Sequence, residues 1–106
     1  MPLLHLPSVP PRNLFAGVRG HYAHGQHTTV GEVILAAGGV VPMHQHPHEQ
    51  VSYIVNGTLE FTVGGEVHVM RPGDCLLIPG GVPHGCRGVT DCKVVDIFSP
   101  VREDYR

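Results

Sequence analysis

The chain has 106 residues, of which 42% are hydrophobic and 15% charged, and this size and balance predict one globular domain. The formal net charge is −2 and the basic residues form no cluster, which argues against a nucleic-acid partner. No apolar run approaches the roughly 18 residues of a membrane span, and the N-terminus lacks the pattern of a signal peptide.

The cysteines, Cys75, Cys86 and Cys92, are odd in number and show no CxxC spacing. This pattern predicts free thiols in a reducing compartment, and we therefore expect a cytoplasmic protein. A catalytic cysteine and a small apolar core residue are both compatible with each position.

The N-terminal segment has four prolines among its first eleven residues, so residues 1 to about 12 are predicted to form an extended arm. From about residue 28 onward, apolar and polar side chains alternate, as in Thr58–Val63 and Glu66–Val69, which is typical of half-buried strands. The predicted division is a proline-rich arm with the first strand or strands over residues 1–27 and a barrel over residues 28–106.

Turn signals separate the alternating runs. Asn56-Gly57 and Gly64-Gly65 both tolerate positive φ, and each is predicted to close a two-residue hairpin. No segment has a helical period with caps. Many short strands at regular spacing predict an all-β sandwich or barrel.

The segment His44-Gln45-His46-Pro47-His48-Glu49-Gln50 concentrates imidazoles in one short stretch. In extended chain His44 and His46 share a face, Pro47 ends the strand, and Gln50 begins the next strand, which runs to Val55. A ligand pair on one strand and a third ligand on its hairpin partner would converge, and His84 follows a later Pro/Gly turn. For His44 and His46 alone, metal binding and an ordinary pair of surface histidines remain equal alternatives.

The spacing around these histidines resembles the two motifs of the cupin superfamily, G-x5-HxH-x3,4-E-x6-G and G-x5-PxG-x2-H-x3-N. The matching positions are Gly38, His44, His46, Gln50 and Gly57 for the first motif, and Gly73, Pro79, Gly81 and His84 for the second. Gln50 replaces the usual Glu, and Gly88 replaces the usual Asn. The resemblance implies a double-stranded β-helix (jelly-roll) barrel, commonly dimeric, with one divalent metal inside its mouth.

Carried over by position, the metal ligands are His44, His46, Gln50 and His84. Glu49 lies one residue short of the Glu position and is expected to face away, whereas His48 remains a rival ligand. Imidazole suits Ni, Zn, Fe, Mn and Cu, so the identity of the metal stays open. A neutral amide would leave the metal its full charge, which favours Lewis acidity and an anionic substrate but weakens metal retention.

Two longer stretches, residues 44–65 and 94–105, resemble the KdgF family, which converts 4,5-unsaturated uronic acids to linear keto forms. That resemblance implies catalytic roles for Asp96 and Phe98, and a substrate carboxylate held by Arg102. The alternatives are an Asp96 that faces water on an edge strand or pairs with an arginine, and an Arg102 in a surface ion pair.

We therefore expect a small-molecule substrate that is an anionic sugar. A different metal cupin enzyme such as an Fe(II) dioxygenase, and a non-catalytic sugar-binding or sensor cupin, are the alternatives. Val51, Tyr53 and Val55 would face away from the ligand-bearing side of their strand. Such an apolar outer face needs a cover, which predicts a homodimer.

Overall fold

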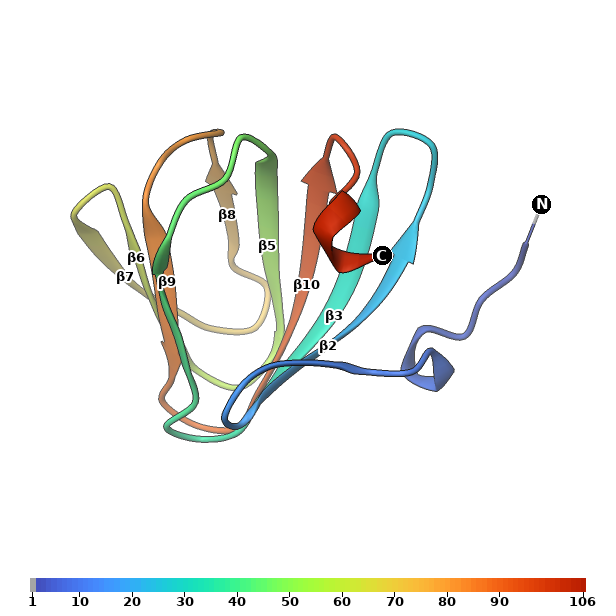
Figure 1. The fold of residues 1–106 in the computed structure, drawn as a ribbon. Helices are drawn as coiled ribbons and strands as arrows, with labels where there is room; N and C mark the ends of the chain where they lie inside the picture. Colours follow the sequence, from blue (N-terminus) through green and yellow to red (C-terminus); the bar gives the residue numbers. More distant parts are fainter. Residues whose placement is uncertain (1) are drawn as a thin grey trace.

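The computed structural model describes residues 2–106 and consists of two antiparallel sheets packed face to face (Figure 1). The six-stranded sheet has the order β1 (Arg12–Phe15), β2 (Val18–His24), β3 (Thr29–Leu35), β10 (Cys92–Ser99), β5 (Glu49–Asn56) and β8 (Cys75–Ile78). The four-stranded sheet has the order β4 (Val40–His44), β9 (His84–Gly88), β6 (Leu59–Val63) and β7 (Glu66–Met70). The predicted all-β jelly-roll barrel is confirmed.

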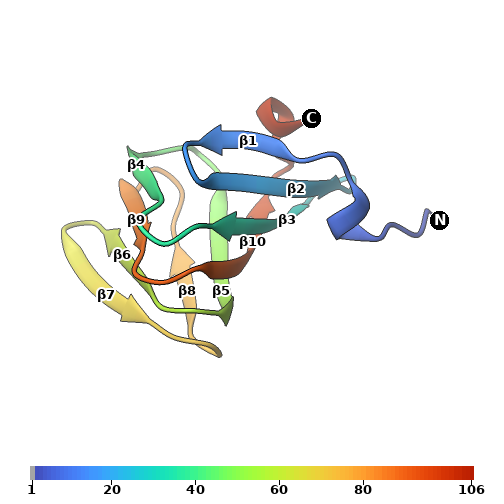
Figure 2. The ribbon, with the colours of Figure 1, turned by 90° about the horizontal axis from the view of Figure 1, so that it is seen from below.

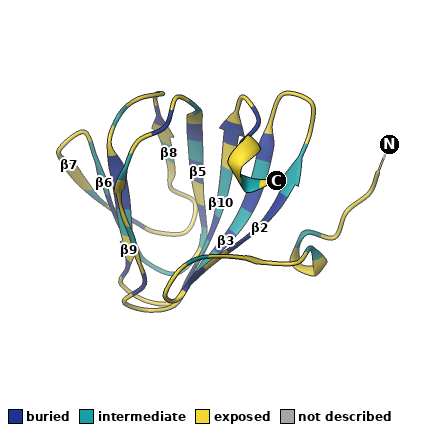
Figure 3. Ribbon diagram, in the orientation of Figure 1, coloured by how far each residue is buried: buried dark blue, intermediate teal, exposed yellow. Residues whose placement is uncertain are grey.

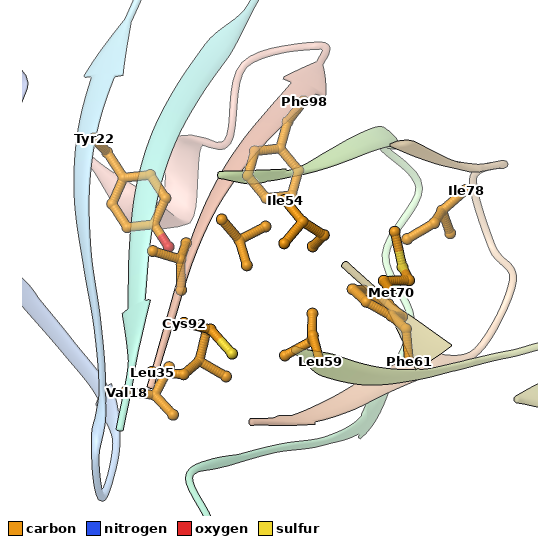
Figure 4. Packing of buried hydrophobic residues seen from close by; sticks show 12 residues of the cluster. Val18, Tyr22, Leu35, Ile54, Leu59, Phe61, Met70, Ile78, Cys92 and Phe98 are labelled. Atoms are coloured by element: carbon orange, nitrogen blue, oxygen red, sulfur yellow. The ribbon is translucent and has the colours of Figure 1, made fainter. Parts of the chain in front are cut away.

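The strands follow the predicted alternation, because buried residues alternate with more exposed ones along them (Figure 3). β3 shows it most regularly, with every second residue buried from Thr29 to Leu35. The interior is filled from both sheets, with Ile54 and Leu59 fully buried near its middle and Tyr22 and Phe98 toward one end (Figure 4). This packed interior fixes the positions of the polar side chains at that end.

The N-terminal segment projects from the barrel before it joins the sheet (Figures 1 and 2). It contains a short 3-10 helix, η1 (Leu6–Ser8), and β1 then adds to the outer edge of β2. β2 pairs with β3 over its whole length, so residues 18–24 are an integral part of the six-stranded sheet. Among the described residues, no helix has the length and apolar character needed to cross a membrane.

The two predicted hairpins have different outcomes. β6 and β7 form a two-residue hairpin at Gly64-Gly65, where both glycines have positive φ, so that prediction is confirmed. The hairpin at Asn56-Gly57 is wrong, because β5 and β6 belong to different sheets and this turn carries the chain across the barrel. Gly57 has φ +84°, and a Cβ there would lie 2.1 Å from the carbonyl oxygen of Asp91. The glycine therefore serves a close backbone approach at this crossover.

Candidate metal centre

Three histidines meet between the two sheets at one end of the barrel. His44 ends β4 and His84 begins β9, and these residues are direct partners in the register of the two strands. His46 follows two residues after β4, and the ligand atoms of the three imidazoles lie within 4.8 Å of one another. Adjacent pairing of β4 and β9 thus brings together histidines that are forty residues apart in the sequence.

The predicted hairpin between the His44 strand and the Gln50 strand is wrong. β4 pairs with β9 in the four-stranded sheet, whereas Gln50 lies on β5 in the six-stranded sheet. Gln50 nevertheless reaches the histidines, because its buried side chain crosses the interior and its Oε1 lies 3.0 Å from His46 Nε2. The candidate site is therefore built by two facing sheets.

Each imidazole of the cluster is oriented in the same way. The Nδ1 atoms of His44, His46 and His84 face the backbone carbonyls of Pro42, His48 and Val82, at 2.9, 3.1 and 2.8 Å. A neutral histidine that donates through Nδ1–H keeps a lone pair on Nε2, the arrangement found in histidines that bind metals. His84 Nε2 is buried and has no hydrogen-bond partner among the described residues, as expected for an atom that binds a metal.

The contact between His46 and Gln50 supports the same conclusion. Burial lowers the pKa of His46 to about 4, and the charge of Arg102 adds to this effect, so the ring is neutral near pH 7. Since its proton is on Nδ1, Nε2 and the Gln50 oxygen present two lone pairs at 3.0 Å, which repel each other. His44, His46 and His84 could together hold a metal ion, and Oε1 of Gln50 lies beside them.

Asp96 joins this centre through a serine. It lies on β10 directly opposite Ser52 of β5, and Ser52 Oγ donates to Asp96 Oδ1 at 2.6 Å. Burial raises the pKa of Asp96 to about 6, although its hydrogen bonds and the charge of Arg102 oppose that shift. β10 lies between β3 and β5, so the alternative of a water-facing aspartate on an edge strand is wrong.

Arg102 follows β10 and is almost fully buried. Its Nε and Nη2 donate to the two carboxylate oxygens of Asp104, at 3.0 and 2.9 Å. The alternative of a surface ion pair is therefore correct in that Arg102 forms an ion pair. The guanidinium is not on the surface, however, because only 6% of the side chain is exposed. It lies over the rings of Phe98 and Tyr105, at 4.8 and 4.0 Å from their centroids. Tyr105 belongs to the short helix η2 (Glu103–Tyr105), which lies beside this end of the barrel (Figure 1).

Two residues between His46 and Gln50, His48 and Glu49, lie outside the three-histidine cluster. Glu49 is exposed at the start of β5, which agrees with its expected outward direction. His48 Nε2 faces the carbonyl oxygen of Val101 at 3.2 Å, and its own backbone carbonyl receives the Nδ1–H of His46. This geometry gives His48 a role in holding its neighbours. Its Nδ1 is buried without a hydrogen-bond partner among the described residues, so His48 stays a predicted rival ligand.

The chain matches a family model described as a cupin domain over residues 31–98. The chain belongs to the cupin family. It is a KdgF-like cupin: it is 31% identical over 75 residues to the pectin degradation protein KdgF of Dickeya dadantii, covering 69% of this chain and 68% of that one. The solved structure of KdgF from a Halomonas species matches with a TM-score of 0.86 and 31% identity, over 92% of this chain and 91% of that chain. Quercetin 2,3-dioxygenase of Bacillus subtilis is 37% identical over 71 residues, which cover 61% of this chain and 21% of the dioxygenase.

The cavity of this cupin extends from the histidines into the barrel and encloses about 630 Å³ including its open mouth. His44, Gln50, His84, Asp96, Phe98 and Arg102 all line it. Sequence reasoning missed Ser52, Asp104, Tyr105 and Tyr22, which position or surround these residues. For Ser52 a signal was present, because strand alternation puts it on the same face as Gln50. For the aromatic pair no pattern in the sequence pointed to the contact.

Proposed function

We propose that this KdgF-like cupin is a metal-dependent enzyme that converts 4,5-unsaturated uronic acids to their linear keto forms. The observation that carries the proposal is one cavity lined by His44, Gln50 and His84 of the candidate metal centre together with the carboxyl group of Asp96 and the guanidinium of Arg102. The relative from Dickeya dadantii is named a pectin degradation protein, and the chain aligns with most of its length.

The reaction needs proton transfer but neither oxidant nor reductant. Opening the ring breaks the C1–O5 bond of the cyclic hemiacetal, so that the C1 hydroxyl loses its proton and becomes an aldehyde, while O5 gains a proton and becomes an enol. The enol then moves its proton from O5 to C4, which gives the keto form. Asp96, whose pKa is near 6, is suited to accept and return these protons, an effect worth roughly 10²–10⁴-fold.

Arg102 is placed to bind the carboxylate of the substrate. Asp104 occupies its Nε and Nη2 edge. Arg102 also lines the cavity that His44, His84 and Asp96 line. A carboxylate in that cavity can therefore bind at the remaining edge of the guanidinium. Phe98 lies against the guanidinium and lines the same cavity.

A divalent metal held by His44, His46, Gln50 and His84 would act as a Lewis acid toward a substrate oxygen. All four donors are uncharged, so the centre would keep a net positive charge that attracts an anionic sugar. The structure leaves the identity of the metal open among Ni, Zn, Fe, Mn and Cu.

A second candidate function is oxygenation by Fe(II), which the similarity to quercetin 2,3-dioxygenase favours. One experiment separates the two candidates. Purified protein loaded with single metals is given lyase-generated unsaturated monouronates, and the ultraviolet absorbance of the conjugated double bond and the dissolved oxygen are followed together. Enzyme-dependent loss of absorbance at constant oxygen supports the uronate reaction. If the protein consumed oxygen with an aromatic substrate and left the absorbance of the uronate unchanged, oxygenation would replace uronate conversion as the proposed function.

We also propose that the protein is a homodimer. The outer face of the six-stranded sheet carries neighbouring apolar side chains on three adjacent strands, where Val51 lies opposite both Leu77 and Ile97. Leu77 is 70% exposed and Ile97 41% exposed. A contiguous apolar face of this kind is uncommon on monomers. A monomeric mass by light scattering at micromolar concentration would refute the proposal.

A further inference from the structure

Ser52 links the metal centre to Asp96, although neither cupin motif includes it. It lies in the middle of β5, its side chain faces the interior, and it is completely buried. Gln50 Nε2 donates to Ser52 Oγ at 3.0 Å, and Ser52 Oγ donates to Asp96 Oδ1 at 2.6 Å. One side of the serine therefore contacts a predicted metal ligand and the other side contacts the predicted proton carrier.

The direction of these two hydrogen bonds follows from the number of protons available. An ionised Asp96 can only accept, so the single hydroxyl proton of Ser52 is directed to it. The hydroxyl oxygen can then only accept, so Gln50 must present its NH₂ group to Ser52. The opposite end of the amide, Oε1, is thereby turned toward His46 Nε2 and the histidine cluster. An oxygen is the end of an amide that binds a metal, since the NH₂ group has no available lone pair.

We propose that Ser52 is a positioning residue that selects the metal-binding end of the Gln50 amide and couples its orientation to the carboxylate of Asp96. The inference rests on the proposed metal centre and does not depend on the identity of the substrate.

The same pair of hydrogen bonds explains why a glutamine stands where the cupin motif has a glutamate. A glutamate at position 50 has no N–H, so its second oxygen would meet the acceptor side of Ser52. Ser52 could then donate to only one of two carboxylates, and a second negative charge would lie near Asp96. A glutamine can accept at the metal and donate to the serine at the same time. The Gln50, Ser52 and Asp96 side chains thus form one matched set.

A simpler role for Ser52 is to fill the interior, where a small side chain fits between the strands. Alanine would fill nearly the same volume but would break both hydrogen bonds. Threonine would keep the hydroxyl. Ser52→Ala and Ser52→Thr therefore separate packing from hydrogen bonding, and Ser99→Ala serves as a control. Ser99 lies on β10, and the hydrogen bond of its Oγ goes to the carbonyl of His27, away from the centre.

The test measures metal affinity in the absence of substrate. Wild type and variants are stripped of metal, checked for native circular dichroism, and titrated with Zn²⁺ and Ni²⁺ in competition with a chromophoric chelator. Loss of an outer partner of a metal ligand typically weakens affinity 10–100-fold, and we expect a loss in this range for Ser52→Ala. Ser52→Thr and Ser99→Ala should remain within about threefold of wild type. Equal affinities for wild type and Ser52→Ala would overturn the inference.

A second comparison decides the question if Ser52→Ala does not fold. Asp96→Asn keeps a carbonyl that can accept from Ser52, whereas Asp96→Ala leaves the hydroxyl free to turn toward Gln50. Both variants lose the same charge, so a difference between them reports the orientation of Ser52. We expect Asp96→Ala to bind metal more weakly than Asp96→Asn. Equal affinities for the two variants would also overturn the inference. If the wild type itself bound neither metal, the metal centre of the proposed function would fail, which is a separate outcome.

Discussion

Gly31→Ala should destabilise the protein through a single side-chain collision. Gly31 of β3 lies directly opposite Tyr22 of β2, and the tyrosine ring lies across it. A Cβ at position 31 would be 2.4 Å from Cε1 and 2.6 Å from Cδ1 of Tyr22. Gly31 is not among the glycines with positive φ, so alanine causes no strain in its own backbone. The destabilising part of the effect must therefore come from the ring, since alanine by itself restricts the unfolded chain and stabilises slightly.

The size of the effect follows from the contact distances. Carbon atoms pack at about 3.5–4.0 Å, so the ring of Tyr22 must move by more than about 1 Å. Tyr22 is only 7% exposed, and its ring centroid lies 4.7 Å from that of Tyr105, which leaves little room for that movement. Overpacking of a core typically costs about 1–3 kcal/mol, and we expect a loss of stability in this range. Tyr105 lies against Arg102, so KM for the uronate should rise as well.

Urea unfolding at fixed protein concentration measures the change, since a dimer would make stability depend on concentration. Gly25→Ala is the matched control, because a Cβ there would meet only Thr28, at an ordinary 3.5 Å. Its free energy of unfolding should stay within about 0.5 kcal/mol of wild type. Adding Tyr22→Leu to Gly31→Ala should cost less than the two single changes predict. If Gly31→Ala were as stable as Gly25→Ala, the collision would not determine the stability of this site.

Three further predictions test the centre. His84→Ala should lose most of the metal, because it removes a buried ligand, whereas Glu49→Ala should keep it; elemental analysis measures both. Asp96→Asn should fold, keep its metal and lose at least about two orders of magnitude in turnover, because it removes the proton carrier. Asp104→Ala releases Arg102 from its bidentate partner, and a loss of about 1 kcal/mol in binding should raise KM about fivefold with a smaller change in kcat.

Each of these expectations has a clear contrary result. Full metal content in His84→Ala protein would contradict the ligand assignment, and near-wild-type turnover by Asp96→Asn would end its catalytic role. For Asp104, the control is Glu103→Gln, which changes a neighbouring exposed carboxylate that pairs with Arg106 at 3.4 Å. A KM that is unchanged in Asp104→Ala, or raised equally in both variants, would show that Asp104 does not position Arg102.

The alternating pattern was enough to predict an all-β sandwich or barrel and the inward face of strands such as β10, and the resemblance to the cupin motifs selected the barrel. It placed Asp96 with Val94 and Phe98 on one face of β10, and all three line the cavity. The predicted ligands are also close together in the structure, because their motif spacing reflects where strands end and turns begin. These features depend on contacts near in the sequence or on a periodicity that any strand must obey.

The pairing of the strands was decided only by tertiary structure. Alternation does not say which strands are neighbours, so Asn56-Gly57 looked like a hairpin although β5 and β6 lie in opposite sheets. The contact of Ser52 with Asp96 likewise requires β5 and β10 to pair, at a separation of 44 residues. Such pairings are selected by the burial of whole faces, which is a property of the packed chain. The sequence thus determined which side chains point inward, and packing between distant strands decided which of them meet.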